Sequence, residues 1–525
     1  MLYSLRGEYV VDNFKYKVIR DAACGLIGLS ETELTIINLP IFQRLRRIHQ
    51  TGFLSMTFPS ATHTRFSHSL GVLYYANLMC NQINRDNKQI LKPDEIKIIR
   101  LAALLHDIGH SPFSHTLENV SKSFLPKTTT SITSETGSKS ENGYLNVLNI
   151  DLVKTITKIH KNKTQNIKEL FGHEIMGSMI IETHPEINSI LKKEFKSDFE
   201  TSKLKIQKSI CGDIGDGIYM GILHSELDAD KCDYLKRDSI SSGVKYGFYE
   251  FEHIIENMEV DSKEREIVFR YKSLKSIEYF MFARYFLYNQ IFYHKTNLGF
   301  NWLAEKSYQA LLKVKKFFNP KELIESMDNK DFSIFESYDD YNFLISCQNL
   351  YKELQSRSKL NNKEKFDKDI LKKIIYRDPL KPVLVCETFT NKSESNPSPT
   401  NPPFSLLKDF LENKINKMSE EIQVPKEWII TDLGFDVPIT KIPKFPSEPL
   451  YSPPSTIQEE QEIRIFSDKP QNSKPIGEIN SSIIMPLANI HLNAKFLFTK
   501  DDTYKKQIID YISENEPSLK EFIIE

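Results

Sequence analysis

The spacing of apolar side chains is helical over most of the first 378 residues. In residues 94–107 apolar positions recur with the helical period, two acidic residues follow Pro93 at the start, and Gly109 follows the end. Residues 66–84 carry a similar broad apolar face. Such spacing, bounded by residues that start and stop helices, predicts an α-helix in both segments. The same pattern predicts helices over three further segments, 173–183, 204–238 and 274–297.

The pattern changes near residue 379. Of the 24 prolines, 17 lie at or beyond Pro379, and short apolar runs stand between them. Short apolar runs punctuated by proline are typical of edge strands and extended segments. Such segments are predicted at 428–430, 463–466, 483–484 and 496–498, and helices are predicted over 404–422 and 503–524.

These patterns predict a mainly α protein in two parts. Residues 1–378 are expected to form a helical core, and residues 379–525 a smaller, proline-rich accessory region of mixed α+β structure. Two polar stretches interrupt the pattern. Residues from about 121 to 143 are expected to be a Ser/Thr-rich insertion, and residues 389–403 a linker or loop.

Composition narrows the class of protein. The 525 residues include 69 Lys and Arg against 70 Asp and Glu, a net charge of -1, which gives no support to a polybasic membrane binder or a nucleic-acid coat protein. The six cysteines form no CxxC pair, which excludes zinc-ribbon and thioredoxin folds, and such sparse usage is typical of a reducing compartment. No signal-peptide pattern or membrane-length apolar run is present. We therefore expect a cytoplasmic protein without a membrane partner.

Histidines gather around the string HDIGHSPFSH, residues 106–115. It begins with His106 and Asp107 at the predicted end of a helix, and two more histidines follow residues that break the helix. A neutral imidazole and a carboxylate suit a divalent transition metal, but further ligands must come from other helices. The candidates there are His68, Asp228, Asp230 and Asp233. A set of two histidines and two aspartates leaves positions open for water and a phosphate oxygen, which favours metal-assisted phosphate chemistry.

Six blocks of sequence stand in an order and at spacings that rarely recur by chance. They are FQRLRRIHQTG (42–52), FPSATHTRFSHSLGV (58–72), LLHDIGHSPFSH (104–115), GHE (172–174), DADKCDYLKRD (228–238) and, more loosely, MFARYFLYNQIFYHK (281–295). In these blocks the chain resembles the HD-domain phosphohydrolases. More narrowly, it is similar to the deoxynucleoside triphosphate (dNTP) triphosphohydrolases typified by the mammalian SAM-and-HD-domain protein and its bacterial relatives. The resemblance spans roughly residues 14–300 and does not include a SAM domain.

The resemblance implies a metal site with catalytic residues beside it. The implied ligands of a Mn, Fe, Zn or Mg ion are His68, His106, Asp107 and Asp230. The resemblance also places His110 and His115 toward the triphosphate, His173 as the general acid, and Glu118 as the residue that orients His173. Such an acid is chemically reasonable, because a cationic imidazole beside a carboxylate can donate a proton to the leaving nucleoside oxygen.

Six further residues match family positions that contact the substrate. The implied triphosphate-binding residues are Arg65, Lys231 and Arg284, whose positive charges suit the phosphate oxygens. Tyr234 matches a tyrosine that packs under the sugar and disfavours a 2′-hydroxyl, and Gln50 and Asp238 match residues that bond the 3′-hydroxyl. Taken singly, each residue also fits a surface salt bridge or a core position.

The basic run of residues 43–47 has two interpretations. The plain one is a solvated helix face. The other comes from the family, whose members are often oligomers with nucleotide activator sites at subunit contacts. The positions that resemble such a site are Lys17, Val18, Gln43, Arg46, Arg270, Lys272 and Lys295. Asn38 replaces the family's acidic guanine reader, and the DPxHG signature appears as DAACG at 21–25, so a different activating nucleotide or a degenerate site is expected.

We therefore expect a metal-dependent enzyme that hydrolyses dNTPs to deoxynucleoside and inorganic triphosphate. From the family we also expect a dimer or tetramer and an activating nucleotide. Two alternatives stay open. The same site could act on a nucleoside monophosphate, a cyclic nucleotide or an alarmone, since HD sites hydrolyse many phosphate esters. The chain could instead be a nucleotide sensor or a nucleic-acid-binding protein, which the balanced charge disfavours.

Overall fold

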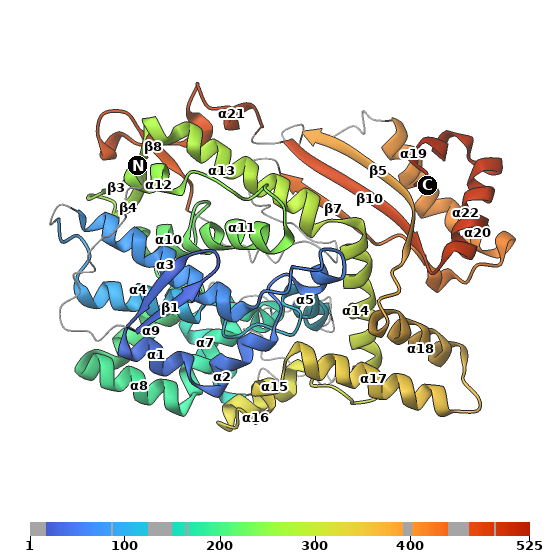
Figure 1. Cartoon of the computed structure of the whole chain (residues 1–525), viewed down its shortest axis with the longest axis horizontal. Coiled ribbons are helices and arrows are strands. Elements are labelled where there is room, and N and C mark those ends of the chain that lie inside the picture. The colour runs from blue at the N-terminus through green and yellow to red at the C-terminus, as the bar shows by residue number, and fades with distance from the viewer. Residues whose placement is uncertain are drawn as a thin grey trace, which may run out of the picture.

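The fold was analysed in a computed structural model. It describes residues 17–85, 88–123, 150–161, 163–164, 167–391, 402–438, 461–487 and 490–524. The protein is mainly α-helical with small sheets, most of whose strands lie in the second half of the chain, which confirms the predicted fold class (Figure 1). Most of the expected insertion at 121–143 and of the expected linker at 389–403 lies outside the described residues.

The first half of the chain forms helices around one apolar core. They are α1 (Glu31–Ile37), α2 (Pro40–Gln43), α3 (Arg65–Ile83), α4 (Pro93–Leu105), α5 (His115–Ser123), α6 (Asp151–Ile159), α7 (His173–Thr183), α8 (Pro185–Phe195), α9 (Phe199–Ile210), α10 (Gly217–Leu223), α11 (Ala229–Ser242) and α12 (Phe251–Glu256). The helices predicted at 66–84, 94–107 and 173–183 are confirmed as α3, α4 and α7.

One long helix predicted over 204–238 is wrong, because turns divide it into α9, α10 and α11. Gly212 and Gly215 adopt φ angles of 64° and 72°, a left-handed conformation that ends a helix. Asp216 and Asp228 then accept backbone N–H groups at the starts of α10 and α11.

The second half of the chain adds further helices. They are α13 (Leu274–Leu287), α14 (Lys295–Lys313), α15 (Pro320–Asp328), α16 (Ser333–Glu336), α17 (Asp340–Ser356), α18 (Asn362–Ile375), α19 (Pro402–Asp409), α20 (Ile415–Ile422), α21 (Ile484–Leu487) and α22 (Asp502–Asn515). Among the helices that the structure describes, none is both long and apolar enough to cross a membrane.

The helices predicted over 274–297 and 404–422 are each interrupted. A π-helical turn at Tyr288–Phe292 follows α13, and the His294 side chain accepts the Thr296 N–H at the start of α14. A second π-helical turn, Phe410–Lys414, separates α19 from α20. The helical pattern at 503–524 is confirmed as α22 and a 3₁₀ turn, Pro517–Phe522.

The strands in the described part of the chain form three small sheets. Their strands are β1 (Lys17–Asp21), β2 (Gly25–Leu29), β3 (Met258–Asp261), β4 (Glu266–Arg270), β5 (Lys381–Asn391), β6 (Ile429–Ile430), β7 (Gly434–Pro438), β8 (Arg464–Phe466), β9 (Lys474–Pro475) and β10 (Ile490–Thr499). β1 and β2 form a hairpin, the second sheet has the order β3-β4-β8-β9, and β5-β10-β6 form the third with β7 beside β10. The extended segment predicted at 483–484 is wrong, because Ile484 begins α21.

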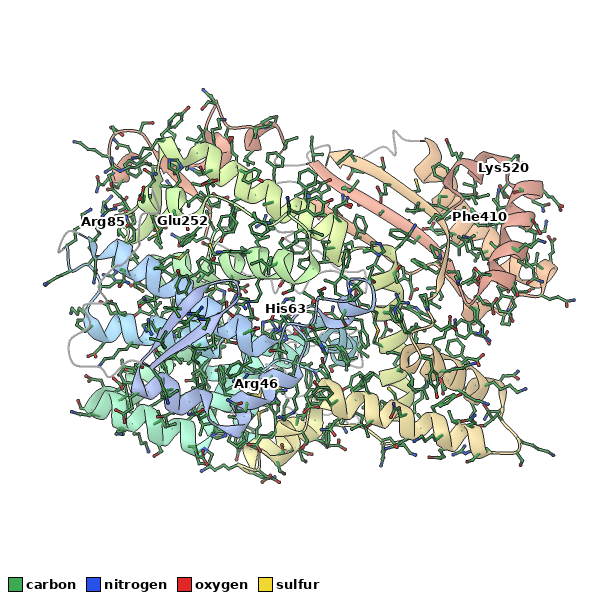
Figure 2. All side chains as sticks on the ribbon, in the orientation of Figure 1. Arg46, His63, Arg85, Glu252, Phe410 and Lys520 are labelled. Atoms are coloured by element: carbon green, nitrogen blue, oxygen red, sulfur yellow. The ribbon has the colours of Figure 1, made fainter. Side chains whose placement is uncertain are left out.

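The last part of the chain packs in two places. β5 and β10 surround a second apolar cluster with α20 and α22. Figure 2 shows Phe410, a member of this cluster, and the exposed Lys520 on the same side of the molecule, away from His63 and Arg46. In contrast, β8 pairs in parallel with β4 of the helical body. The division at residue 378 stays a proposal, and the pairing of β8 adds that later residues lie against the helical core.

Arg44 contradicts the plain interpretation of residues 43–47 as a solvated face. Its side chain is fully buried, with an exposed fraction of 0%. The guanidinium donates to the carbonyl oxygens of His110 (2.9 Å), Ile108 (2.7 Å) and Tyr338 (2.7 Å). The Ile108 and His110 carbonyls lie beyond the end of α4, and the Tyr338 carbonyl lies just before α17, so a planar group with five donors joins two separate segments.

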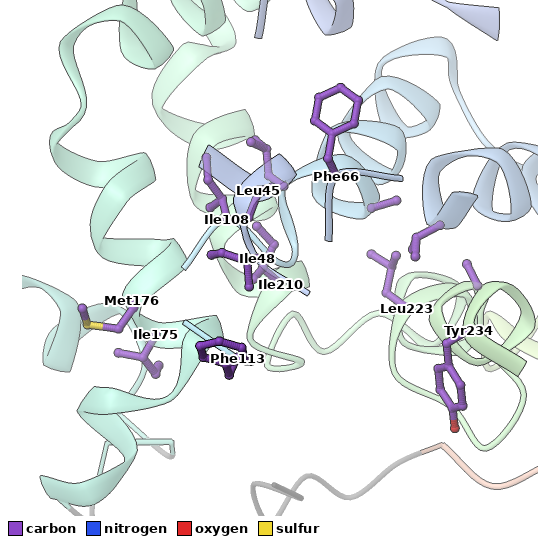
Figure 3. Close-up of a cluster of buried hydrophobic side chains, with 14 of the residues drawn as sticks. Leu45, Ile48, Phe66, Ile108, Phe113, Ile175, Met176, Ile210, Leu223 and Tyr234 are labelled. Carbon is purple, nitrogen blue, oxygen red and sulfur yellow. The ribbon is translucent and has the colours of Figure 1, made fainter. Parts of the chain in front are cut away.

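The loop between α4 and α5 is held from a second side by Asp340. The Asp340 carboxylate accepts the Phe113 N–H at 2.6 Å and the His49 N–H at 2.8 Å. Phe113 and the next residue, Ser114, adopt φ angles of 52° and 57°, which are costly for residues with side chains. Figure 3 shows Phe113 among buried apolar side chains that include Ile48. The loop is therefore fixed by buried contacts despite its strain.

Gly109 allows this loop to approach α7 closely. A Cβ atom at Gly109 would lie 2.1 Å from the His173 carbonyl oxygen and 2.3 Å from the Gly177 nitrogen. Both atoms belong to the backbone and cannot rotate away. Any side chain at position 109 would separate the loop from the N-terminal end of α7.

We predict that Gly109→Ala lowers the free energy of unfolding by about 1–3 kcal/mol, because the added methyl group forces backbone shifts in a packed core. Chemical denaturation of the two proteins measures the difference. The matched control is Gly477→Ala, where an added Cβ meets no atom within 4 Å and the effect should stay below about 0.5 kcal/mol. Equal stability of the Gly109 variant and the wild type would contradict the close approach.

Candidate active site and metal centre

Three neighbouring segments supply the implied metal ligands. His68 lies in the first turn of α3, His106 and Asp107 follow the last residue of α4, and Asp230 lies in the first turn of α11. α3 packs against both α4 and α11, which brings the three segments together. The Asp228 carboxylate accepts the Lys231 N–H at 2.8 Å and so fixes the start of α11.

The four side chains converge on one small volume. His68 Nε2 lies 2.8 Å from Asp230 Oδ1 and 3.7 Å from Asp107 Oδ2. His106 Nε2 lies 3.2 Å from Asp107 Oδ1 and 4.0 Å from Asp230 Oδ1. One ligand atom each from His68, His106 and Asp230 falls within 4.8 Å of the others. The four residues that the sequence indicated as ligands therefore lie close together in the structure, and their role as ligands is a proposal.

The histidines are oriented as metal ligands would be. Among the described residues, neither Nε2 atom of His68 and His106 has a hydrogen bond of good geometry, although both are buried. Their Nδ1 atoms are engaged instead, His68 with Asp233 Oδ2 at 2.8 Å and His106 with the Ala103 carbonyl oxygen at 2.8 Å. A hydrogen bond at Nδ1 leaves the Nε2 lone pair for a metal. The residues present therefore fit a divalent ion.

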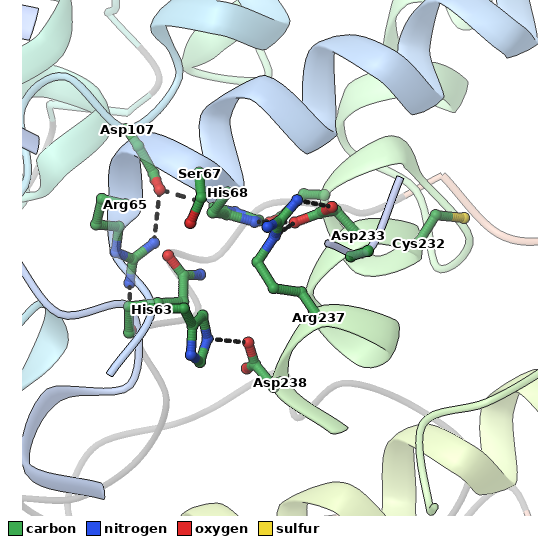
Figure 4. Close-up of polar contacts among 12 residues, drawn as sticks. His63, Arg65, Ser67, His68, Asp107, Cys232, Asp233, Arg237 and Asp238 are labelled. Atoms are coloured by element: carbon green, nitrogen blue, oxygen red, sulfur yellow. Dashed lines mark hydrogen bonds and ion pairs between the residues drawn. The ribbon is translucent and has the colours of Figure 1, made fainter. Parts of the chain in front are cut away.

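Asp107 stays ionised although it is 1% exposed. Burial raises the pKa of its carboxyl, but the positive charge of Arg65 and the nearby His106 and His110 hold this pKa well below its usual value. Arg65 Nη1 donates to Asp107 Oδ2 at 2.7 Å (Figure 4). Burial lowers the pKa of His68, and the nearby carboxylates of Asp230 and Asp233 raise that pKa to about 10. The four-residue set thus attracts positive charge.

A second cluster lies beside the first and is centred on Glu118. Glu118 Oε2 lies 3.0 Å from His173 Nδ1 and 3.4 Å from His115 Nδ1, and Glu118 Oε1 accepts a hydrogen bond from Lys122 Nζ at 2.8 Å. The His173 ring stacks on His110 with a centroid distance of 3.9 Å. All four catalytic residues that the sequence suggested, His110, His115, Glu118 and His173, therefore lie in this cluster.

Of the three histidines in the second cluster, His173 is the one whose pKa is raised. Burial lowers the pKa of His173, but the carboxylates of Glu118 and Glu174 outweigh it and raise this pKa above 6.5. Burial lowers the pKa of His115 to about 4, and burial together with Arg65 lowers that of His110 well below 6.5. His173 is therefore the one imidazole of the three that the described surroundings favour as a cation.

His110 joins the two clusters. Its Nε2 lies 3.2 Å from Asp107 Oδ1, and its ring stacks on His173. The Asp107 carboxylate, the His110 ring and the His173 ring thus form a continuous line from the metal centre to the proton donor. A substrate phosphate bound at the first cluster would therefore lie close to an acid in the second.

The residues expected to bind substrate lie around the same helices. Arg65 and Lys231 are buried, and each donates to an internal carboxylate, Lys231 Nζ to Asp228 Oδ2 at 2.8 Å. Tyr234 lies one turn after Asp230 on α11, with its ring centroid 6.4 Å from that of Phe292. The other three predicted residues are also buried, Gln50, Asp238 and Arg284.

His63 is a site neighbour that belongs to the group of histidines seen in the sequence but had no predicted role. Its Nε2 lies 2.6 Å from Asp238 Oδ1 (Figure 4). Lys122, the partner of Glu118, was missed, and its signal was the spacing of four residues on one helix. Asp233 was a candidate ligand in sequence, but the structure places it behind His68, on Nδ1.

The seven residues suggested for an activator site are spread over separate stretches. They lie on β1 (Lys17, Val18), at α2 and the following turn (Gln43, Arg46), around the end of β4 (Arg270, Lys272) and at the start of α14 (Lys295). α13 separates the last two groups, and its 14 residues span about 20 Å (Figure 1). The described part of one chain therefore does not gather them into one cluster.

Comparison with known proteins supports this geometry. A family model described as the HD domain matches residues 65–238, which contain every implied metal ligand. An uncharacterized Methanocaldococcus jannaschii protein, MJ1154, is 31% identical over 53% of this chain and 46% of its own length. The deoxynucleoside triphosphate triphosphohydrolase SAMHD1 of Gallus gallus is 25% identical over 79% of this chain and 63% of its own length.

A solved structure shares the fold. A Bacteroides thetaiotaomicron phosphohydrolase superposes with a TM-score of 0.59 at 20% identity, over 92% of this chain and 100% of that one. The match to MJ1154 spans about half of that relative, and the match to SAMHD1 less than two thirds. The chain therefore carries an HD domain at residues 65–238, and it resembles the HD-domain dNTP triphosphohydrolases at the level of the family.

Proposed function

We propose that this protein is a metal-dependent hydrolase of dNTPs that releases deoxynucleoside and inorganic triphosphate. One observation carries the proposal: the set of His68, His106, Asp107 and Asp230 lies directly beside His173, whose pKa is raised, with His110 between them. Cleavage of a phosphate ester needs both an activated oxygen and a proton for the leaving group. The similarity to SAMHD1 supports a dNTP as the substrate.

The residues of the site would have distinct roles in catalysis. The metal would be held by His68, His106, Asp107 and Asp230, and when bound it supplies Lewis-acid activation of water and of the phosphate. His173 would donate its Nε2 proton to the 5′-oxygen of the leaving nucleoside, because Nδ1 faces Glu118. Lys122 keeps Glu118 ionised, so the His173 cation persists until the leaving oxygen takes the proton.

The remaining residues would bind the substrate. Arg65, Lys231 and Arg284 supply positive charge for a triphosphate, and a buried, low-dielectric position strengthens that attraction. The Tyr234 ring would pack against the sugar, and Gln50 and Asp238 would bond the 3′-hydroxyl. Tyr234 and the metal ligand Asp230 share one face of α11, which supports a sugar close to the phosphates.

We also propose that a nucleotide activator, where one acts, binds between copies of this chain. The support is that the seven candidate residues do not cluster within one described chain. Arg46 Nε donates to Gln43 Oε1 at 2.8 Å, and its guanidinium lies over the Phe66 ring at 3.6 Å. Arg270 is paired with Glu259. Mass in solution with and without nucleotide tests the assembly.

The reaction is tested by product analysis. With dNTPs and Mn²⁺ or Mg²⁺, the wild-type protein should release inorganic triphosphate, and a panel of ribonucleoside triphosphates, monophosphates and cyclic nucleotides should react more slowly. The double variant His106→Ala, Asp107→Ala should show no turnover, because it removes two of the four metal ligands. Release of orthophosphate or pyrophosphate by the wild type would contradict the proposed reaction.

The C-terminal sheet offers a matched control for that variant. His491 Nδ1 lies 2.6 Å from Asp436 Oδ1, so this region also contains a partly buried His–Asp pair. The double variant His491→Ala, Asp436→Ala removes the same atoms far along the chain and should keep its turnover. Equal loss of activity in both double variants would mean that lower folding stability, and not removal of metal ligands, causes the loss.

The proton donor is tested by the pH dependence of kcat. The folded-state pKa of His173 is raised by Glu118, so the cation needed as acid is present below that pKa and is lost as the pH rises through it. Glu118→Gln removes this carboxylate while burial remains, so the alkaline limb should move to lower pH. Glu118→Asp keeps the charge and should move it less. His173→Ala should lower kcat by about 10²–10⁴-fold.

Tyr234 is expected to set the preference for a deoxyribose. Tyr234→Ala should raise kcat/KM for ribonucleoside triphosphates relative to dNTPs by about 10-fold, because the ring no longer fills the space beneath the sugar. Tyr234→Phe keeps the ring and serves as the control, with the preference retained. The measurement is kcat/KM for each dNTP and for the matching ribonucleoside triphosphate. An unchanged ratio of the two values in the alanine variant would contradict a role for Tyr234 in sugar binding.

A further inference from the structure

Behind the metal ligand His68 lies a chain of buried charges that ends at the N-terminal hairpin. His68 Nδ1 lies 2.8 Å from Asp233 Oδ2, and Asp233 has an exposed fraction of 0%. Arg237 grips the same carboxylate, with Nε donating to Oδ2 at 2.7 Å and Nη2 to Oδ1 at 2.9 Å. Arg237 also donates from Nη1 to Asp21 Oδ2 at 2.8 Å and from Nη2 to Asp21 Oδ1 at 3.0 Å.

Asp21 occupies the tip of the β1–β2 hairpin. It pairs with Gly25 as the last step of the hairpin register, and its Oδ1 accepts the N–H groups of Ala23 and Cys24 at 2.9 Å each. The Cys24 thiol in turn donates to Asp233 Oδ1 at 3.4 Å. The tip of the hairpin therefore contacts both Arg237 and Asp233, so its position is coupled to theirs.

The packing of α3 on α11 leaves room for this network at one point. A Cβ at Gly71, on α3 three residues after His68, would lie 1.8 Å from Asp233 Oδ1 and 2.6 Å from Arg237 Nη2. Figure 4 shows the side chains of His68 and Arg237 meeting at the Asp233 carboxylate. The carboxylate thus sits in a gap that the two helices keep free of side chains.

The charges depend on one another. A buried carboxylate without its partner is costly, and losing one member of a buried pair leaves the other uncompensated. Arg237 pairs with two carboxylates, those of Asp21 and Asp233. Asp21 therefore balances part of the positive charge of Arg237, and its two hydrogen bonds fix the plane of the Arg237 guanidinium. With both in place, Asp233 accepts from His68 Nδ1, and His68 Nε2 faces Asp107 and Asp230.

We infer that the hairpin tip is a positioning element of the metal centre: Asp21 acts through Arg237 and Asp233 to hold His68 in the orientation that binds metal. This inference rests on the metal site of the proposed function. It also gives the hairpin, whose first strand carries Lys17 and Val18, a direct contact route to a metal ligand. A ligand that displaced the hairpin would change metal affinity along this route.

The test is a double-mutant cycle in which the affinity for a divalent metal is measured in the absence of nucleotide. In calorimetric titrations with Mn²⁺, Asp233→Asn should weaken binding by about 10–100-fold, as residues behind metal-binding histidines usually do. Asp21→Asn should weaken it by about 10-fold, the lower end of that range. In the Asp233→Asn protein, adding Asp21→Asn should cause no further loss, because the route is already broken.

A matched control comes from α10. Asp216 also caps a turn, accepting the Ile218 N–H at 3.0 Å, and pairs with an arginine, its Oδ2 lying 3.0 Å from Arg265 Nε. Asp216→Asn should therefore reproduce any loss of stability without changing Mn²⁺ affinity. Arg237→Lys supplies an independent variant that keeps the charge but loses the fork, and its affinity should fall like that of Asp21→Asn.

Three results would overturn the inference. They are wild-type affinity in Asp21→Asn and Arg237→Lys, losses that add in the double variant, and an equal loss in Asp216→Asn. Metal binding that follows the expected pattern in a protein without dNTP hydrolysis would remove the proposed function and leave this inference standing. A wild-type protein that binds no divalent metal would overturn both.

Discussion

The ionised Asp107 carboxylate is the constraint on which the rest of the site depends. A buried negative charge is stable only when positive or hydrogen-bonding groups surround it, and Asp107 has Arg65 at 2.7 Å and three imidazoles nearby. Those groups come from segments that α3 and α4 bring together. One charge thus specifies the relative placement of His68 and His106 and, through His110, of His173.

The backbone around Asp107 has to be held as firmly as its side chain. Arg44 satisfies carbonyl groups just beyond the end of α4, and Asp340 satisfies N–H groups of the following loop and of His49. Both residues come from segments distant in sequence from the loop. The helical body therefore contributes directly to the geometry of the site, because a strained loop keeps its shape only where its surroundings determine it.

The sequence predicted the long helices better than the connections between them, and it named candidate site residues that lie close together in the structure. α3, α4 and α7 have clear apolar periods and terminal residues, whereas the divisions at Gly212, Gly215 and the π-helical turns depend on local backbone geometry that apolar spacing does not register. The ligand set was recognisable because its residues stand in short local motifs. The roles of Arg44 and of the Asp21–Arg237 pair could not be recognised from the sequence. A buried arginine and a surface arginine look alike in sequence, because their partners are distant residues.

The pairing of β8 with β4 has a consequence for how the chain is made. Phe269 pairs with Ile465, about 200 residues later, and the segment just before β8 contacts the residues leading into α11 through Gln461 and His224. At about 5–20 residues per second, a ribosome needs roughly 10–40 s to bridge that interval. During this time the nascent helical body exposes the edge of β4, which is open to pairing with other chains until the late strand arrives.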